Sequence, residues 1–124
     1  MDAQLLKGKK ILVVDDVKIN YILIKGLLRD EGVDVLWAED GFQAVNRYKT
    51  EHPDLILMDY HMPGKNGYET AEEIKREHKS TPIICQTTDS VAPVLADKKE
   101  VFDDILIKPI NKNNLLKKIY ENIA

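Results

Sequence analysis

The sequence predicts an α/β fold in which a five-stranded parallel β-sheet is covered by helices on both faces. Short apolar runs recur along the chain, and the segments between them carry apolar residues at helical spacing. The runs are nearly continuous and contain β-branched residues, which is typical of strands that are buried on both faces. Strands and helices that alternate in this way form a parallel sheet with right-handed crossovers.

The apolar runs are the predicted strands. In chain order they are ILVV (11–14), VDVLWA (33–38), LILM (55–58), PIIC (82–85) and ILI (105–107). Runs of this length are ordinary for strands in globular proteins.

Helical spacing follows most of these strands. The first helix is expected after Asp16, the second after Asp40 as its N-cap, the third out of the loop at 64–67, and the last after a cap at Asn111 or Asn114. The expected faces are Ile19, Ile22, Leu23, Leu27 and Leu28; Phe42, Val45 and Tyr48; Tyr68, Ala71, Ile74 and Lys75; and Leu115, Leu116, Ile119, Tyr120 and Ile123.

The segment 89–101 breaks this regular alternation. Pro93 lies inside it, and the letters ADKKEV offer little apolar surface. Because proline disrupts a helix interior, we expect a short or distorted fourth helix here.

Length and composition indicate one soluble domain. The chain has 124 residues, of which 44% are apolar and 31% are charged. A net charge of −3 gives no reason to expect direct binding to nucleic acid or to a membrane surface. The single cysteine, Cys85, excludes an internal disulfide and is expected in the core, which fits a cytoplasmic location. Residues 1–8 are interpreted as a polar lead-in and residues 9–124 as the domain.

Polar side chains stand where the predicted strands end. The first strand runs into Asp15 and Asp16, the third into Asp59, the fourth into Thr87 and the fifth into Lys108. In an open α/β sheet the ligand site lies beyond the carboxyl ends of the strands. If these strands are neighbours, three carboxylates, a hydroxyl and an ammonium meet at one place.

This set of groups favours phosphoryl transfer. Three carboxylates repel one another unless a cation lies between them, and Mg²⁺ prefers such oxygen ligands. A carboxylate beside a metal ion and Lys108 is able to attack a phosphoryl group and form an aspartyl phosphate.

The chain resembles a two-component receiver domain from about Lys9 to Ile123. The motifs ILVVDD, LILMDYHMPGKNG, PIICQTT and ILIKPI occur in the order that this family has. The resemblance implies a doubly wound, flavodoxin-like three-layer fold with strand order 2-1-3-4-5 and five helices.

The resemblance also assigns roles to individual residues. Asp59 would be the phosphoacceptor, Thr87 would bind a phosphoryl oxygen, and Lys108 would pair with the phosphoryl group. The implied Mg²⁺ ligands are Asp15, Asp16, Asp59 and the backbone carbonyl of His61.

Further positions are expected to modulate the phosphorylated state. His61 and Asp89 stand where relatives place residues that flank the attacking water, so we predict that they tune the lifetime of the phosphoryl group; the alternative is that both face solvent. Thr88 replaces the common small residue after Thr87 and is included with them.

The chain departs from the family pattern at several positions. Val17 stands where an Asn often follows the acid pair, and Ile105 replaces the usual aromatic residue of the fifth strand. Gln86 interrupts an otherwise apolar strand, and Pro93 disturbs the fourth helix. We therefore expect intact phosphorylation chemistry and an unusual response to it.

The stretch DDVKINYILIKGLL, with Asn20, is similar to the receivers of hybrid sensor histidine kinases. The chain is therefore either a single-domain regulator or, as we favour, a receiver from such a kinase, at the cytoplasmic side of a membrane-anchored sensor. The implied phosphodonor is a histidine kinase or a histidine phosphotransfer domain, docking on the first helix. A homodimer is also compatible with the family. The isolated domain would catalyse only its own phosphorylation and dephosphorylation, so it is no conventional enzyme.

Three other functions fit the residue pattern less well. A pseudo-receiver would keep the fold and bind partners without phosphorylation. A haloacid-dehalogenase-type phosphatase needs a second acid two residues after its nucleophile, where this chain has His61. A flavodoxin-like carrier would place flavin phosphate against Asp15 and Asp16, which would repel it.

Overall fold

A single parallel sheet organises the molecule. The computed structural model describes residues 5–60, 62, 66–77, 80–88 and 101–123. The strands form one sheet in the order β2-β1-β3-β4-β5, as predicted. They are β1 (Lys10–Val14), β2 (Asp34–Ala38), β3 (Leu55–Asp59), β4 (Ile83–Thr87) and β5 (Asp104–Ile107).

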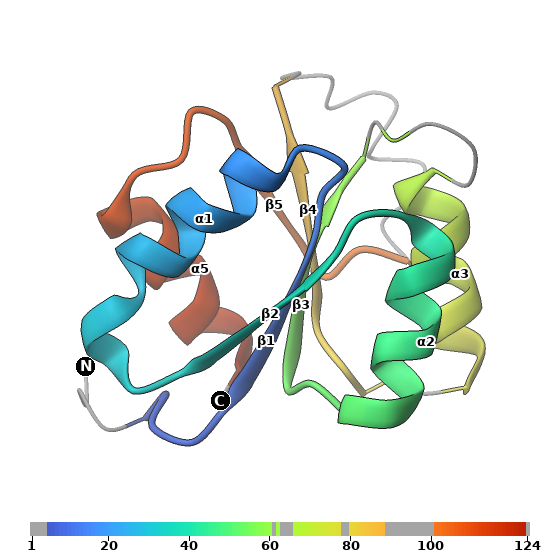
Figure 1. The fold of residues 1–124 in the computed structure, drawn as a ribbon, viewed down its shortest axis with the longest axis horizontal. Helices are drawn as coiled ribbons and strands as arrows, with labels where there is room; N and C mark the ends of the chain where they lie inside the picture. Colours follow the sequence, from blue (N-terminus) through green and yellow to red (C-terminus); the bar gives the residue numbers. More distant parts are fainter. Residues whose placement is uncertain (1–4, 61, 63–65, 78–79, 89–100, 124) are drawn as a thin grey trace.

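Helices cover both faces of this sheet. Helices α1 and α5 lie on one face, and α2 and α3 lie on the other (Figure 1). The predicted fourth helix falls almost entirely on residues 89–100, which lie outside the described residues. The described helices are α1 (Lys18–Leu27), α2 (Gly41–Glu51), α3 (Gly67–Glu77) and α5 (Lys112–Ile123), with a 3-10 turn, η1 (Arg29–Glu31).

Alternate residues of each strand enter two separate cores. In β1, Leu12 and Val14 pack into the core under α2 and α3, whereas Ile11 and Val13 pack into the core under α1 and α5. Every residue of β3 and β4 is buried. This is why the central strands are apolar without alternation. Leu6 is also fully buried in the second core, so the described part of the segment 1–8 packs on the domain.

The helix ends follow local capping chemistry. The Asp40 carboxylate accepts a hydrogen bond from the backbone N–H of Gln43 at 2.8 Å, which confirms the predicted N-cap of α2. The side chain of Asn111 accepts one from the backbone N–H of Asn114 at 2.9 Å, so Asn111 caps α5. No described helix has the length and apolar character that crossing a membrane would need.

The expected apolar face of α1 was partly wrong. Ile24 and Leu28 are buried, whereas Ile19, Ile22 and Leu23 are 69%, 53% and 51% exposed. Residues 24 and 28 lie one turn apart on one face of the helix. Residues 22 and 23 lie one turn after residue 19 on another face, so the helix carries two apolar stripes. Packing on the sheet covers only the first stripe. In α2, Phe42 is likewise exposed, whereas Val45 and Tyr48 are buried as expected.

Gly67 allows the start of α3 to approach the end of β3. A Cβ atom at this position would collide with the backbone oxygen of Asp59 and lie 3.0 Å from the Cα atom of Tyr60. The backbone N–H of Gly67 donates to the carbonyl of Tyr60 at 3.2 Å. Any side chain here would therefore displace the segment that carries Asp59.

Gly67→Ala should lower the free energy of unfolding by about 1–3 kcal/mol, because the new methyl group meets backbone that has no room to yield. Urea unfolding measures this change. Gly26→Ala is the matched control, since a Cβ there meets nothing within 4 Å. It should raise stability by up to about 1 kcal/mol, through helix propensity. Equal effects of the two variants would contradict the proposed close approach.

Candidate functional site

Three carboxylates meet at the carboxyl ends of β1 and β3. Asp15 and Asp16 follow β1 directly, and Asp59 is the last residue of β3, its neighbour in the sheet. One carboxylate oxygen from each of the three lies within 4.8 Å of the others. Asp15 and Asp59 are buried, and Asp16 is exposed. The convergence predicted from the sequence is confirmed for these residues.

Lys108 brings a positive charge to the same place. It follows β5, which is separated from β3 by β4, and its side chain reaches across that strand. Its Nζ atom lies 3.6 Å from Oδ2 of Asp15 and 3.6 Å from Oδ1 of Asp59. The predicted proximity of Lys108 to Asp59 is therefore confirmed.

Asp15 is held by three further groups. Its Oδ1 atom accepts from the backbone N–H of Val17 at 2.9 Å, and its Oδ2 atom accepts from Nδ2 of Asn20 at 3.1 Å. The indole N–H of Trp37 in β2 donates to the backbone carbonyl of Asp15 at 2.9 Å. No local pattern predicts the contact with Trp37, because it joins two segments that only the folded sheet brings together.

Thr87 occupies the expected strand end. It is the last residue of β4 and is buried, and its backbone carbonyl accepts from the N–H of Lys108 at 2.8 Å. This bond ties the ends of β4 and β5 together. Thr88 is exposed in the bend that follows. His61 and Asp89, expected to modulate the site, lie outside the described residues.

The charges of the cluster do not balance. Counted as formal charges, the three carboxylates are three negative groups and Lys108 is one positive group, so the cluster has a surplus of two negative charges. Carboxylate oxygens are hard ligands that Mg²⁺ prefers, and Mg²⁺ commonly binds one or two of them together with a phosphate. The residues present therefore fit a divalent cation.

Comparison with known proteins places the chain in a family. The family model described as "Response regulator receiver domain" matches residues 11–120. The chain belongs to this family. It is also 36% identical to the sensor protein GacS of Pseudomonas syringae pv. syringae, over 88% of this chain and 13% of that protein. The chain thus spans about an eighth of the length of this relative.

Solved receiver structures have the same fold. The chemotaxis protein CheY4 of Vibrio cholerae is 29% identical and superposes with a TM-score of 0.86, over 92% of this chain and 98% of that one. The receiver domain of the sensor histidine kinase PA1611 of Pseudomonas aeruginosa is 30% identical, with a TM-score of 0.84 over 94% and 98%. That receiver was solved with a magnesium ion coordinated in its active-site cleft.

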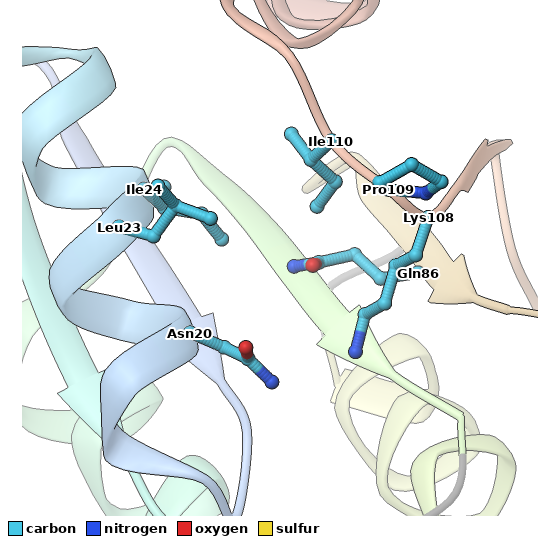
Figure 2. Close-up of a pocket in the computed structure, with 7 residues that line it drawn as sticks. All are labelled: Asn20, Leu23, Ile24, Gln86, Lys108, Pro109 and Ile110. Carbon is cyan, nitrogen blue, oxygen red and sulfur yellow. The ribbon is translucent and has the colours of Figure 1, made fainter.

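Two departures of this receiver domain have different surroundings. Ile105 in β5 is partly buried and packs against the core under α2 and α3. Gln86 in β4 faces the other side of the sheet, toward α1 (Figure 2), and is fully buried. Its side-chain oxygen and nitrogen have no hydrogen-bond partner in the described part of the chain.

Cys85 lies one residue before Gln86 and faces the core under α2 and α3. The pKa of its thiol is raised to about 12; burial is the largest cause, the negative charge of Asp59 adds to it, and Lys108 acts in the opposite direction. Because only the thiolate is nucleophilic, this cysteine should be inert in the folded receiver.

A disulfide-exchange reagent such as DTNB should therefore leave Cys85 unmodified at pH 8 and label it once urea unfolds the chain. The release of the coloured thiolate measures this. Thr88→Cys combined with Cys85→Ser is the positive control, since position 88 is exposed and should react in the folded state. Rapid stoichiometric labelling of the native wild type would disprove the prediction.

Proposed function

We propose that this receiver takes a phosphoryl group from a phosphohistidine onto Asp59. The observation that carries the proposal is the position of the Lys108 ammonium, 3.6 Å from the Asp59 carboxylate, beside the two other acids of the cluster. A carboxylate at a strand end, with a cation beside it and acidic metal ligands next to it, is equipped for phosphoryl transfer.

In the proposed step an oxygen of Asp59 attacks the phosphorus atom. The new O–P bond forms as the P–N bond to the donor imidazole breaks. The imidazole leaves with the electron pair of that bond. When its second ring nitrogen carries no proton, the ring also takes up one proton and leaves as neutral imidazole. Lys108 stabilises the charge on the transferring oxygens. Thr87, at the end of the neighbouring strand, is assigned to donate its hydroxyl to one of those oxygens. In the later hydrolysis, a water oxygen attacks the phosphorus atom as the O–P bond to Asp59 breaks, which returns the free carboxylate and releases inorganic phosphate.

Asp15, Asp16 and Asp59, with the backbone carbonyl of His61, are the proposed ligands of Mg²⁺. The metal would neutralise charge between the carboxylates and the phosphoryl oxygens. One of these ligands is already oriented, because the backbone N–H of Val17 and the side chain of Asn20 donate hydrogen bonds to the two carboxylate oxygens of Asp15. Fixed outer contacts of this kind orient metal ligands and commonly change affinity tenfold or more when they are lost.

The exposed stripe of α1, defined here as Ile19, Ile22 and Leu23, is the proposed docking surface for the donor. All three side chains are more than half exposed. The helix begins three residues after Asp15, so the stripe adjoins the phosphoacceptor site. Neighbouring exposed apolar side chains of this size are typical of interaction surfaces.

The donor is proposed to be a histidine kinase or a histidine phosphotransfer domain. Because a full-length GacS-type relative is about eight times longer than the matched region, we also propose that this receiver derives from a hybrid kinase. A cytoplasmic location and a homodimeric state remain proposals from the family resemblance.

Asp59→Asn should abolish labelling by acetyl phosphate, because the amide lacks the nucleophilic oxygen anion. Intact-protein mass spectrometry measures the added phosphoryl mass. Asp30→Asn is the matched control. It removes an exposed carboxylate of η1 that is not part of the acid cluster, so this variant should label like the wild type. Equal labelling of wild type and Asp59→Asn would refute the assignment, and a wild type that never labels would favour the pseudo-receiver.

Mg²⁺ binding should change the emission of Trp37, the single tryptophan, because its indole N–H is bonded to the backbone of Asp15. Titration with MgCl2 gives the dissociation constant without any phosphodonor. Asp16→Asn should raise that constant about tenfold or more, equivalent to about 1.4 kcal/mol. Asp30→Asn should leave it unchanged. Identical constants for all three proteins would remove Asp16 from the metal site.

A further inference from the structure

The indole of Trp37 links the acid pair to the first helix. Trp37 lies in β2, the edge strand next to β1, and is half-buried. Its N–H donates to the backbone carbonyl of Asp15 at 2.9 Å. Its ring stacks on the ring of Tyr21 in α1, with the ring centroids 5.7 Å apart and the planes inclined by 16°. One side chain therefore joins an edge strand, a helix and the turn that carries Asp15 and Asp16.

This ring pair is flanked by two ammonium groups of α1. The Nζ atom of Lys18 lies 5.6 Å from the centroid of the Trp37 ring, and that of Lys25 lies 5.9 Å from the centroid of the Tyr21 ring. Residues 18, 21 and 25 are spaced by three and four, so they share one face of the helix. Stacked rings and cations over ring faces attract each other, so these contacts restrain the indole.

The bond to the carbonyl of Asp15 acts on the peptide group that leads into Asp16. The backbone N–H of Asp15 donates to the carbonyl of Ala38 at 3.0 Å, which ties this residue to β2 from one side. The indole then binds its carbonyl from the same strand. Because a peptide group is planar, a fixed carbonyl oxygen also fixes the direction in which the chain continues to the Cα atom of Asp16.

Asp16 depends on its backbone more than its neighbour does. The carboxylate of Asp15 is buried and accepts hydrogen bonds from Val17 and Asn20. Asp16 is exposed, so packing does not orient it. One of its carboxylate oxygens nevertheless lies within 4.8 Å of oxygens of Asp15 and Asp59. The peptide that the indole holds is therefore a support for this exposed member of the cluster.

The chemistry of the indole limits it to a supporting role. An indole N–H is a hydrogen-bond donor only, so Trp37 is unsuited to coordinate a cation. Its recorded contacts are with a backbone carbonyl and with α1, and none is with the carboxylates of the cluster. A phenylalanine would offer a similar stacking surface for Tyr21 but would leave the carbonyl of Asp15 without this donor.

We propose that Trp37 is a positioning residue for the Mg²⁺ site. Its N–H holds the peptide between Asp15 and Asp16 in the orientation that suits metal binding, and the stack on α1 holds the indole. The proposal rests on the proposed function, since it requires that the acid cluster binds Mg²⁺.

Trp37→Phe tests the role of the N–H, because the variant keeps an aromatic ring beside Tyr21. An NMR titration of the backbone amide signals with MgCl2 gives the dissociation constant without a phosphodonor. The variant should raise this constant about tenfold, as the loss of an outer contact to a metal ligand commonly does. The MgCl2 concentration for half-maximal labelling by acetyl phosphate should rise by the same factor. The rate at saturating MgCl2 should stay within about twofold, because excess metal restores occupancy of the site.

A second replacement removes the N–H and keeps the shape of the fused ring. Since Trp37 is the single tryptophan, benzothienylalanine supplied to a tryptophan auxotroph replaces this residue alone. Its ring has sulfur in place of the N–H. It should raise the dissociation constant as much as Trp37→Phe does, and it decides the question even if Trp37→Phe fails to fold.

Tyr120→Phe is the matched control. It also removes one hydrogen-bond donor from an aromatic side chain, because the hydroxyl of Tyr120 donates to Glu31 at 3.2 Å. That bond joins α5 to η1 and includes no member of the acid cluster. The control should bind Mg²⁺ like the wild type.

The possible results separate the proposal from its alternatives. Unchanged dissociation constants in both replacements would overturn it, and so would a lower rate at saturating MgCl2 with an unchanged constant. Weaker binding in Trp37→Phe with wild-type binding in the benzothienylalanine protein would assign Trp37 to packing instead. A wild type that binds no Mg²⁺ would reject the metal site of the proposed function and this role with it.

The indole N–H also gives a direct signal in the wild type. Its NMR resonance should be protected from exchange with solvent in the folded receiver and should shift when MgCl2 is added. Exchange as fast as in the urea-unfolded chain would contradict the bond to Asp15, and an unmoved resonance at saturating MgCl2 would contradict the link to the metal site.

Discussion

The ion pairs of Lys108 with Asp15 and Asp59 are the interaction on which the site depends. Parallel strands bring two buried carboxylates to one edge of the sheet, together with the exposed Asp16, and like charges at this separation oppose folding. The ammonium offsets part of that repulsion from a strand that is not adjacent to β3. It leaves a surplus of two formal negative charges, an imbalance that a divalent cation would neutralise.

Backbone and side-chain contacts hold the charged groups in position. Asp15 is fixed from three sides, by the N–H of Val17, the amide of Asn20 and the indole of Trp37. Gly67 packs against the backbone of Asp59, where a side chain at position 67 would displace the backbone of Asp59 and Tyr60. The proposed phosphoryl transfer would need such support, because a reacting group that is held out of position by about an ångström lowers the rate of a reaction severely.

Two features that lower the stability of the domain occur on the same side of the sheet, the side that α1 and α5 cover. The stripe of α1 leaves large apolar side chains in water, and Gln86 buries an amide without a partner. Leu23 of the stripe and Gln86 both line one pocket between α1 and the segment after β5. A fold selected for stability alone would place an apolar residue at position 86 and polar residues along the stripe.

The sequence by itself determined the strands, their parallel arrangement and the residues that end them. Short, continuous apolar runs with β-branched residues are typical of strands buried on both faces, and the carboxyl ends of parallel strands lie at one edge of the sheet. It placed Asp15, Asp16, Asp59, Thr87 and Lys108 at those ends, and the family resemblance supplied the strand order. Only the tertiary structure decided which stripe of α1 faces the core, since that helix is apolar over more than one face. The contacts of Asn20 and Trp37 with Asp15, and the direction of Gln86, also required it. These contacts depend on which segments the folded sheet brings together, and no local pattern along the chain encodes that proximity.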